Sequence, residues 1–197
     1  MLALGLTGSI ATGKSTVLEA FRALDVPIFS ADAAVAEIYA GEATKAVEAL
    51  FPGVSSNGRV DRQKLSQRLA ADPSLFSKLE ALVHPLVRAR IKAFLAAQGG
   101  AEQRLAVVEV PLLLETGYDY GFDAIAVTHV DPAIQRRRAL ARPGMTVEKL
   151  EAILARQLPQ AEKKQRATYL FDTGKGHKET QAEVAALVAT VRSAGED

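Results

Sequence analysis

The sequence contains no cysteine. Disulfides, thiolate nucleophiles and cysteine-based metal sites are therefore excluded. Its three histidines, His84, His129 and His177, lie far apart, which argues against a histidine metal cluster. No apolar run approaches the roughly 18 residues typical of a membrane span, and the N-terminus lacks the basic and apolar segments of a secretory signal. We expect a soluble, cytoplasmic protein without a membrane partner.

The chain also lacks an excess of either charge. Its 197 residues include 24 Lys and Arg against 23 Asp and Glu, for a net charge of +1. This balance argues against a strongly basic nucleic-acid-binding protein. Hydrophobic residues make up 48% and charged residues 24%, which is typical of a globular chain that buries one sizeable core.

Short apolar runs alternate with segments of helical period along most of the chain. Such alternation predicts an α/β fold with a parallel sheet whose two faces are covered by helices. The predicted strands are residues 2–6, 26–29, 105–110, 124–130 and 168–171. The predicted helices are residues 14–24, 31–39, 44–51, 133–141, 147–158 and a closing segment around 184–191.

Residues 41–100 contain no run that reads as a sheet strand. Residues 52–59 are rich in Gly, Pro, Ser and Asn and predict an exposed loop. An apolar stripe of helical period follows over residues 75–87, and Pro85 lies inside it, which predicts a kink or two abutting helices. We therefore expect residues 41–100 to form a helical insertion in the α/β domain.

A phosphate-binding loop follows the first predicted strand. Residues 8–15 read G-S-I-A-T-G-K-S and match the pattern G-x-x-x-x-G-K-[ST] in full, with a helix expected next. Glycines permit close backbone approach, so consecutive N–H groups can point at phosphate oxygens beside the positive end of the helix. Lys14 would contact the β and γ phosphates, and Ser15 would offer its hydroxyl to Mg²⁺. The alternative is a glycine-bearing turn with an exposed lysine.

The remaining residues favour a small-molecule kinase among proteins with such loops. The only asparagine, Asn57, is followed by Gly58, so the N-K-x-D motif of guanine-specific switches is absent. A kinase needs a carboxylate for the acceptor hydroxyl. Asp32 follows the second predicted strand, at the sheet edge where α/β proteins bind ligands. Its alternative role is to cap the following helix.

Positive charge is concentrated after the fourth predicted strand. Residues 131–166 contain nine Lys and Arg and four Asp and Glu, a balance of +5, so the remaining chain sums to −4. Arg138 and Arg142 are spaced to share a helix face. A helical hairpin with these arginines is typical of a lid that closes over phosphates, and the alternative is a solvated basic surface.

Taken in order, these motifs resemble those of the dephospho-coenzyme A kinases along nearly the whole chain. The matching segments are L-T-G-S-I-A-T-G-K-S-T at residues 6–16, S-A-D at 30–32, H-P-L at 84–86, V-P-L-L-L-E at 110–115, Arg138, Arg142 and R-Q-L-P at 156–159. The resemblance implies transfer of the γ-phosphate of ATP to the 3′-hydroxyl of dephospho-CoA, which gives coenzyme A and ADP.

The resemblance also implies a role for each matching residue. Asp32 would be the catalytic carboxylate, and Lys14 and Arg138 would stabilise the transferred phosphoryl group. The residues implied to bind ATP are Gly8, Ala11, Thr12, Gly13, Lys14, Ser15, Thr16 and Arg142. The residues implied to bind the acceptor are Asp32, His84, Pro111 and Leu112. Mg²⁺ would be held at Ser15, and Glu115 would orient a loop.

The implied architecture has three parts. Residues 1–40, 101–130 and 159–197 would form the nucleotide-binding core, residues 41–100 the acceptor-binding helical region, and residues 131–158 the lid. The chain departs from the family where glycine is frequent at positions 9 and 11, and where D-A-D is frequent at 30–32. The alternatives left open are another kinase of this fold, such as a nucleoside monophosphate kinase, and a non-catalytic nucleotide-binding module. His84 could instead be a helix N-cap or a core contact.

Overall fold

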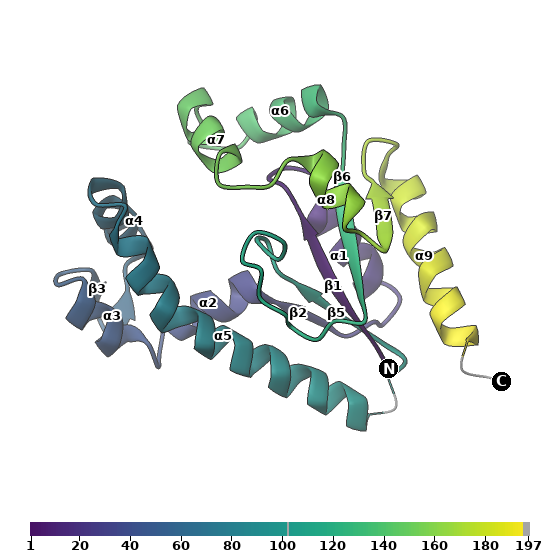
Figure 1. Ribbon diagram of the computed structural model, residues 1–197, viewed down its shortest axis with the longest axis horizontal. Helices are drawn as coiled ribbons and strands as arrows, with labels where there is room; N and C mark the ends of the chain where they lie inside the picture. Colours follow the sequence, from purple (N-terminus) through teal and green to yellow (C-terminus); the bar gives the residue numbers. More distant parts are fainter. Residues whose placement is uncertain (102, 195–197) are drawn as a thin grey trace. The chain divides into compact units, whose positions relative to one another are not determined.

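The computed structural model describes residues 1–101 and 103–194 (Figure 1). Contacts divide the chain into two compact units, one of residues 1–29 and 95–197 and one of residues 30–94. The three functional parts expected from the sequence, with boundaries at 40, 100, 130 and 158, remain predictions.

The first unit is built on a five-stranded sheet with the order β2-β5-β1-β6-β7. The strands are β1 (Leu2–Gly8), β2 (Ile28–Ser30), β5 (Leu105–Glu109), β6 (Ala124–His129) and β7 (Tyr169–Asp172). β1 is central and pairs in parallel with β5 and β6, with Leu4 opposite Val107 on one side and Ala124 on the other. The predicted parallel sheet is confirmed, and the phosphate loop leaves its central strand.

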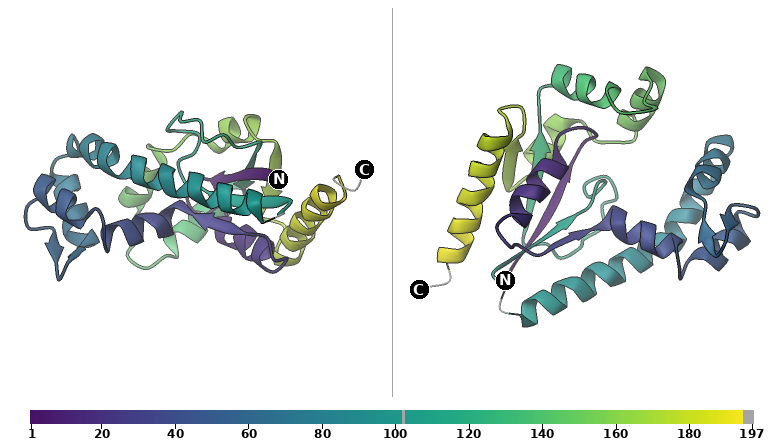
Figure 2. Two further views of the ribbon diagram at one scale, coloured as in Figure 1. Left: turned by 90° about the horizontal axis from the view of Figure 1, so that it is seen from below. Right: turned by 180° about the vertical axis from the view of Figure 1, so that it is seen from behind.

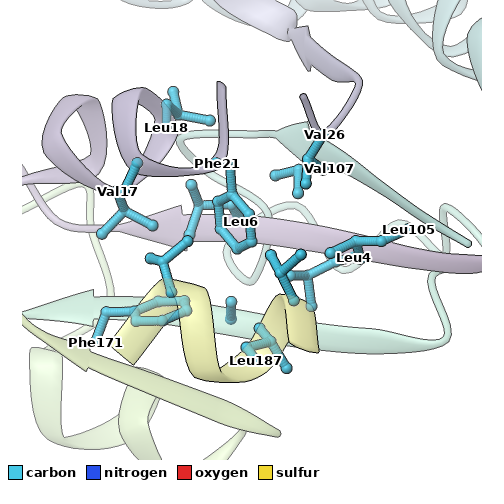
Figure 3. Packing of buried hydrophobic residues seen from close by; sticks show 14 of the residues in the cluster. Leu4, Leu6, Val17, Leu18, Phe21, Val26, Leu105, Val107, Phe171 and Leu187 are labelled. Carbon is cyan, nitrogen blue, oxygen red and sulfur yellow. The ribbon is translucent and has the colours of Figure 1, made fainter. Parts of the chain in front are cut away.

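One face of this sheet carries the main apolar core. It is covered by α1 (Lys14–Arg22) and α9 (His177–Ser193), which lie on the same side in the right panel of Figure 2. Figure 3 shows side chains from both helices meeting Leu4 and Leu6 of β1. Phe21 and Phe171 pack edge to face, with ring centroids 6.0 Å apart. This packing anchors α1, and therefore fixes where the phosphate loop ends.

Three shorter helices follow β6 in the same unit. They are α6 (Pro132–Leu140), α7 (Val147–Leu154) and α8 (Gln160–Gln165). Thr146 caps α7, because its side chain accepts a hydrogen bond from the N–H of Lys149. α7 ends at Leu154 rather than running to 158 as expected, so Arg156 and Gln157 lie in the turn that leads to α8.

The second unit, residues 30–94, contains α2 (Ala31–Tyr39), α3 (Thr44–Leu50), β3 (Ser55–Ser56), β4 (Arg59–Val60), α4 (Arg62–Ala71) and most of α5 (Leu75–Gly100). The expected exposed loop at 52–59 is partly wrong, since β3 and β4 form an antiparallel hairpin there. Asn57 and Gly58, both with positive φ, form its turn, and an Asn-Gly pair favours this geometry.

The structure differs from the sequence analysis at two other places in this unit. α4 was not predicted, although Asp61 caps it through the N–H groups of Gln63 and Lys64. α5 is assigned as one helix with Pro85 inside it, so the expectation of two abutting helices is wrong. The apolar stripe explains this, because Val83 and Val87 on either side of Pro85 are buried, and packing on one face outweighs one lost helical hydrogen bond.

Candidate active site

The phosphate loop joins β1 to α1, in the predicted order of strand, loop and helix. Gly13 is the N-cap of α1, with a left-handed φ of 87° and ψ of 22°. A Cβ at this position would lie 2.6 Å from Thr173 Oγ1, so both conformation and space require glycine. α1 therefore begins directly at the loop, so the positive end of its helix dipole lies there.

Lys14 and Ser15 begin α1. The Lys14 ammonium donates a hydrogen bond to the Gly8 carbonyl at 2.9 Å and so spans the loop from one end to the other. Ser15 is exposed, and Thr16 is half-buried. The loop therefore offers a cation, a hydroxyl and a helix N-terminus within consecutive residues, which is the combination that binds a polyphosphate.

Buried threonines hold the loop from beneath. Thr12 Oγ1 donates to the Ser9 carbonyl at 2.8 Å and lies 2.7 Å from Thr128 Oγ1. Because the Thr12 hydroxyl hydrogen is used on Ser9, Thr128 is the donor in the second bond. Thr173 Oγ1 donates to the Thr12 carbonyl at 2.9 Å. The shape of the loop thus depends on β6 and on the segment after β7.

Ala11 is the loop residue that contacts the following helices. Its φ is 60°, in the left-handed region that a residue with a Cβ rarely adopts. Its methyl group is buried in a small apolar cluster with Ala139 of α6 and Leu150 of α7. The departure from glycine therefore adds apolar contacts with the predicted lid.

Arg138 contacts the same threonine that supports the loop. Its guanidinium donates to Thr173 Oγ1 at 3.0 Å and to the Thr173 carbonyl at 2.9 Å, and its side chain is otherwise exposed. The structure thus connects Arg138 to the phosphate loop through one intervening residue. Arg142 is exposed and lies beyond the end of α6 at Leu140, so the expectation that it shares a helix face with Arg138 is wrong.

The segment after β5 contains Pro111, Leu112 and Glu115. The Pro111 carbonyl accepts a hydrogen bond from Thr7 Oγ1 at 3.1 Å, which attaches this segment to the end of β1. Pro111 and Leu112 are half-buried. This part of the predicted acceptor site is therefore adjacent to the strand that carries the phosphate loop.

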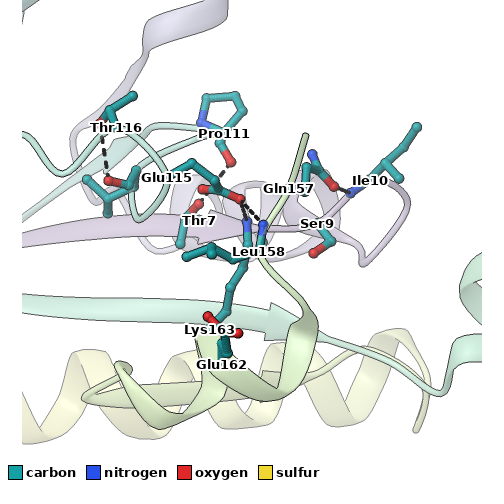
Figure 4. Close-up of polar contacts among 12 residues, drawn as sticks. Thr7, Ser9, Ile10, Pro111, Glu115, Thr116, Gln157, Leu158, Glu162 and Lys163 are labelled. Atoms are coloured by element: carbon teal, nitrogen blue, oxygen red, sulfur yellow. Dashed lines mark hydrogen bonds and ion pairs between the residues drawn. The ribbon is translucent and has the colours of Figure 1, made fainter. Parts of the chain in front are cut away.

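Glu115 forms a buried ion pair with Lys163 (Figure 4). Lys163 Nζ lies 2.7 Å from Glu115 Oε1, and the exposed fractions of the Lys163 and Glu115 side chains are 0% and 12%. The same oxygen accepts the N–H of Leu158 at 2.9 Å. Glu115 therefore anchors the turn between α7 and α8, and no sequence motif indicated Lys163 as its partner.

The tip of the phosphate loop is bound by glutamine side chains that sequence reasoning also missed. The N–H of Ile10 donates to Gln157 Oε1 at 2.9 Å, and Gln135 Nε2 donates to the Ile10 carbonyl at 2.8 Å. Gln157 belongs to the R-Q-L-P segment at 156–159, which was matched as a motif without a role. Gln135 carried no signal at all, because an isolated glutamine on a helix is unremarkable.

Asp32 and His84 lie in the second unit. Asp32 is exposed in the first turn of α2, and the cap of that helix is Ser30, whose side chain accepts from the N–H of Ala33. The alternative that Asp32 is merely the cap is therefore wrong. His84 is half-buried in the middle of α5, so it is not a helix N-cap.

His129 ends β6, close to the loop supports described above. Burial lowers the pKa of its imidazole, and nearby Lys164 lowers this pKa further, while Asp172 opposes the shift. Since the ordinary value is already below 7, the imidazole is neutral at pH 7. His129 therefore adds no positive charge to this edge of the sheet.

Protein side chains alone do not form a metal cluster in the part of the chain that the structure describes. Over residues 1–101 and 103–194, no group of three His, Asp or Glu residues is placed to hold a metal ion. Within the same residues, no helix is long and apolar enough to cross a membrane.

Comparisons with known proteins agree over the length of the chain. A relative named dephospho-CoA kinase from Rhodopseudomonas palustris (strain BisB18) is 50% identical over 189 residues, covering 96% of this chain and 95% of its own length. One of the same name from Rhizobium etli is 48% identical over 192 residues, covering 98% and 95%.

Solved structures show the same fold. The crystal structure of TT1252 from Thermus thermophilus superposes with a TM-score of 0.81 at 30% identity, over 96% of both chains. A dephospho-CoA kinase from Campylobacter jejuni superposes with a TM-score of 0.67 at 22% identity, again over 96% of both chains. The family model for dephospho-CoA kinase matches residues 2–179, and this chain belongs to the dephospho-CoA kinase family.

Proposed function

We propose that the chain transfers the γ-phosphoryl group of ATP to the 3′-hydroxyl of dephospho-CoA, which gives coenzyme A and ADP. One observation carries the proposal in a chain of this family. The phosphate loop is folded with Lys14 across it, and Arg138 is attached to Thr173, which itself supports the loop. Two cations are thereby associated with one phosphate-binding backbone.

The proposed reaction needs few groups from the protein. The 3′-oxygen of the acceptor attacks the γ-phosphorus, and the bond between that phosphorus and the β–γ bridging oxygen breaks, with its electron pair leaving on ADP. Asp32 would accept the proton of the acceptor hydroxyl. Lys14 and Arg138 would stabilise the charge on the transferred group. Arg142 would contact ATP from the lid.

Mg²⁺ fits the residues at the start of α1. Ser15 is exposed there beside Lys14, and a hydroxyl oxygen is a ligand that Mg²⁺ prefers. Ser15 would therefore hold the ion together with the phosphate oxygens of ATP. When bound, the ion would neutralise phosphate charge and fix the conformation of the triphosphate.

Four residues are proposed to bind the acceptor. Pro111 and Leu112 lie beside the end of β1, whereas His84 lies on α5 and Asp32 on α2.

We further propose a cytoplasmic location and small molecules, rather than nucleic acid or membrane, as partners. The near-neutral net charge of +1 supports this choice.

A direct assay tests the function. Purified protein is mixed with Mg-ATP and dephospho-CoA, and the products are separated and identified as coenzyme A and ADP. Coenzyme A, whose 3′-hydroxyl is already phosphorylated, is the matched control and should not be consumed. Turnover with a nucleoside monophosphate but not with dephospho-CoA would contradict the proposal, as would ATP binding without transfer to either acceptor.

A further inference from the structure

Three glutamines, Gln135, Gln157 and Gln160, form one hydrogen-bonded chain that ends at the tip of the phosphate loop. The backbone N–H of Val130 donates to Gln160 Oε1 at 3.1 Å, and Gln160 Nε2 donates to Gln135 Oε1 at 2.7 Å. Gln135 Nε2 donates to the Ile10 carbonyl at 2.8 Å, and the Ile10 N–H donates to Gln157 Oε1 at 2.9 Å. We call these four bonds the glutamine chain.

The direction of every bond in the glutamine chain is fixed. A backbone N–H can only donate and a carbonyl can only accept, so the bonds to Val130 and Ile10 decide how each amide is oriented. Gln135 must donate to Ile10 while accepting from Gln160, which its amide does and an ionised carboxylate cannot do. Position 157 needs only an acceptor. The chain therefore requires different chemistry at two positions that carry the same residue.

The hydrogen bonds to Ile10 lie next to a strained residue of the phosphate loop. Ala11, directly after Ile10, has a φ of 60°, and the left-handed conformation is sterically strained for a residue with a Cβ. Gln135 is 7% exposed, so its hydrogen bonds have little competition from water. The N–H and the carbonyl of Ile10 are thus both held by side chains from outside the loop, next to a strained residue.

We propose that Gln135 and Gln157 are positioning residues for ATP binding. They hold the Ile10 backbone, and through it they keep the N–H groups that follow in the loop in their phosphate-binding directions. A loop that is already ordered loses less conformational entropy when the nucleotide binds. The proposal rests on the proposed use of ATP by this loop, and it assigns a binding contribution to residues that act only through Ile10.

The fixed bond directions supply a matched pair of variants, Gln135→Glu and Gln157→Glu. Each substitution adds one negative charge to a side chain of almost unchanged shape. Both side chains form a hydrogen bond with the backbone of Ile10. A carboxylate oxygen at position 157 still accepts the Ile10 N–H, whereas one at position 135 faces the Ile10 carbonyl without a hydrogen between them. Gln165→Glu, on an exposed residue at the end of α8, controls for added charge alone.

The measurement is the Kd for ATP in excess Mg²⁺, by isothermal titration, with the thermal unfolding midpoint of each variant recorded. We expect Gln135→Glu to bind ATP on the order of tenfold more weakly than Gln157→Glu, since it loses a buried hydrogen bond and leaves an acceptor unpaired. Equal Kd values for the two variants would overturn the proposal. Gln165→Glu should bind like the unsubstituted protein.

The pH dependence adds a readout that a merely structural role would not move. A protonated carboxylic acid at position 135 can donate to the Ile10 carbonyl again. The ATP affinity of Gln135→Glu should therefore recover, relative to that of Gln157→Glu, as the pH falls from about 8 towards 6 and the buried carboxyl takes up a proton. A constant ratio of the two Kd values over this range would contradict the proposal.

If Gln135→Glu does not fold, position 157 carries the test alone. Gln157→Leu removes the acceptor and should raise the Kd for ATP by a larger factor than Gln157→Glu, which keeps it. Equal values would again overturn the proposal. The titration needs no acceptor substrate, so ATP binding without transfer to dephospho-CoA would refute the proposed function alone, and transfer with equal Kd values would refute the positioning role alone.

Discussion

The phosphate-loop edge and the helical unit of residues 30–94 are held together in different ways. Around the loop, side chains bond to partners that are distant in sequence, such as Thr12 with Thr128 and Thr173 with Thr12. In the helical unit most bonds are local caps and turns, exemplified by Asp61 with Gln63 and Lys64. Damage to one partner should therefore spread through the first region and stay local in the second.

The largest loss of stability is expected from the buried ion pair of the first region. Lys163→Met leaves the Glu115 carboxylate buried without its cation, and should lower the free energy of unfolding by about 3–5 kcal/mol. Unfolding in denaturant measures this loss of free energy. Adding Glu115→Leu to the same chain should restore much of the loss, although the Leu158 N–H then lacks its acceptor.

Arg136→Met is the matched control for that measurement. It removes the cation of an exposed ion pair with Glu151 in the same unit, and should change the free energy of unfolding by less than about 1 kcal/mol. Equal losses for Arg136→Met and Lys163→Met would show that burial does not distinguish the two pairs.

Within the helical unit, we expect Asp32 to affect the rate of the reaction rather than the stability of the fold. Asp32→Asn removes the proposed base and should lower kcat by about 10²-fold or more, with little change in the Kd for ATP. Steady-state kinetics with dephospho-CoA as the varied substrate checks this. Glu19→Gln, an exposed carboxylate on α1, should leave kcat unchanged, and an equally unchanged kcat for Asp32→Asn would remove Asp32 from the mechanism.

The same local cap occurs in both regions and allows a direct test. Asp61 caps α4, and Asp131 caps α6 through the N–H groups of Ala133 and Ile134. Asp61→Ala and Asp131→Ala should each lower the free energy of unfolding by about 1 kcal/mol. Only Asp131→Ala should also weaken ATP binding, because α6 carries Gln135. Equal ATP affinities in titrations of the two variants would count against any difference between the regions.

A similarly small effect is expected at Arg90 on α5. Its guanidinium contacts Glu37 at 2.8 Å and Glu42 at 2.9 Å, and all three side chains are partly or largely exposed. Arg90→Ala should lower the free energy of unfolding by roughly 1 kcal/mol or less. A loss as large as that for Lys163→Met, measured under the same denaturant conditions, would mean that the helical unit is not held mainly by local contacts.

The sequence was informative where a feature depends on neighbours in the chain. The phosphate loop and the strands were predicted because their signals lie within a few residues. The Asn57-Gly58 turn was visible in the same way but was read as an open loop. α4 was missed because its two buried leucines, Leu65 and Leu69, give only a weak helical period.

The supports of the candidate site could not be predicted in this way. Gln135 and Ile10 are 125 residues apart, and Gln157 and Ile10 are 147 apart, so no local pattern connects them. A glutamine on a helix is ordinarily a solvated residue, and its partner becomes evident only when the sheet order brings β6 beside β1. Lys163 was counted only among the positive residues of 131–166, and its full burial was not predicted because lysines are rarely fully buried.

The bond from Thr173 to Thr12 also sets a time for the growing chain. The two residues are 161 apart, so at roughly 5–20 residues per second the ribosome needs about 10–30 s between making one and making the other. During that interval the phosphate-loop segment lacks residues that shape it. We therefore expect the loop to reach this shape only after Thr173 has been made.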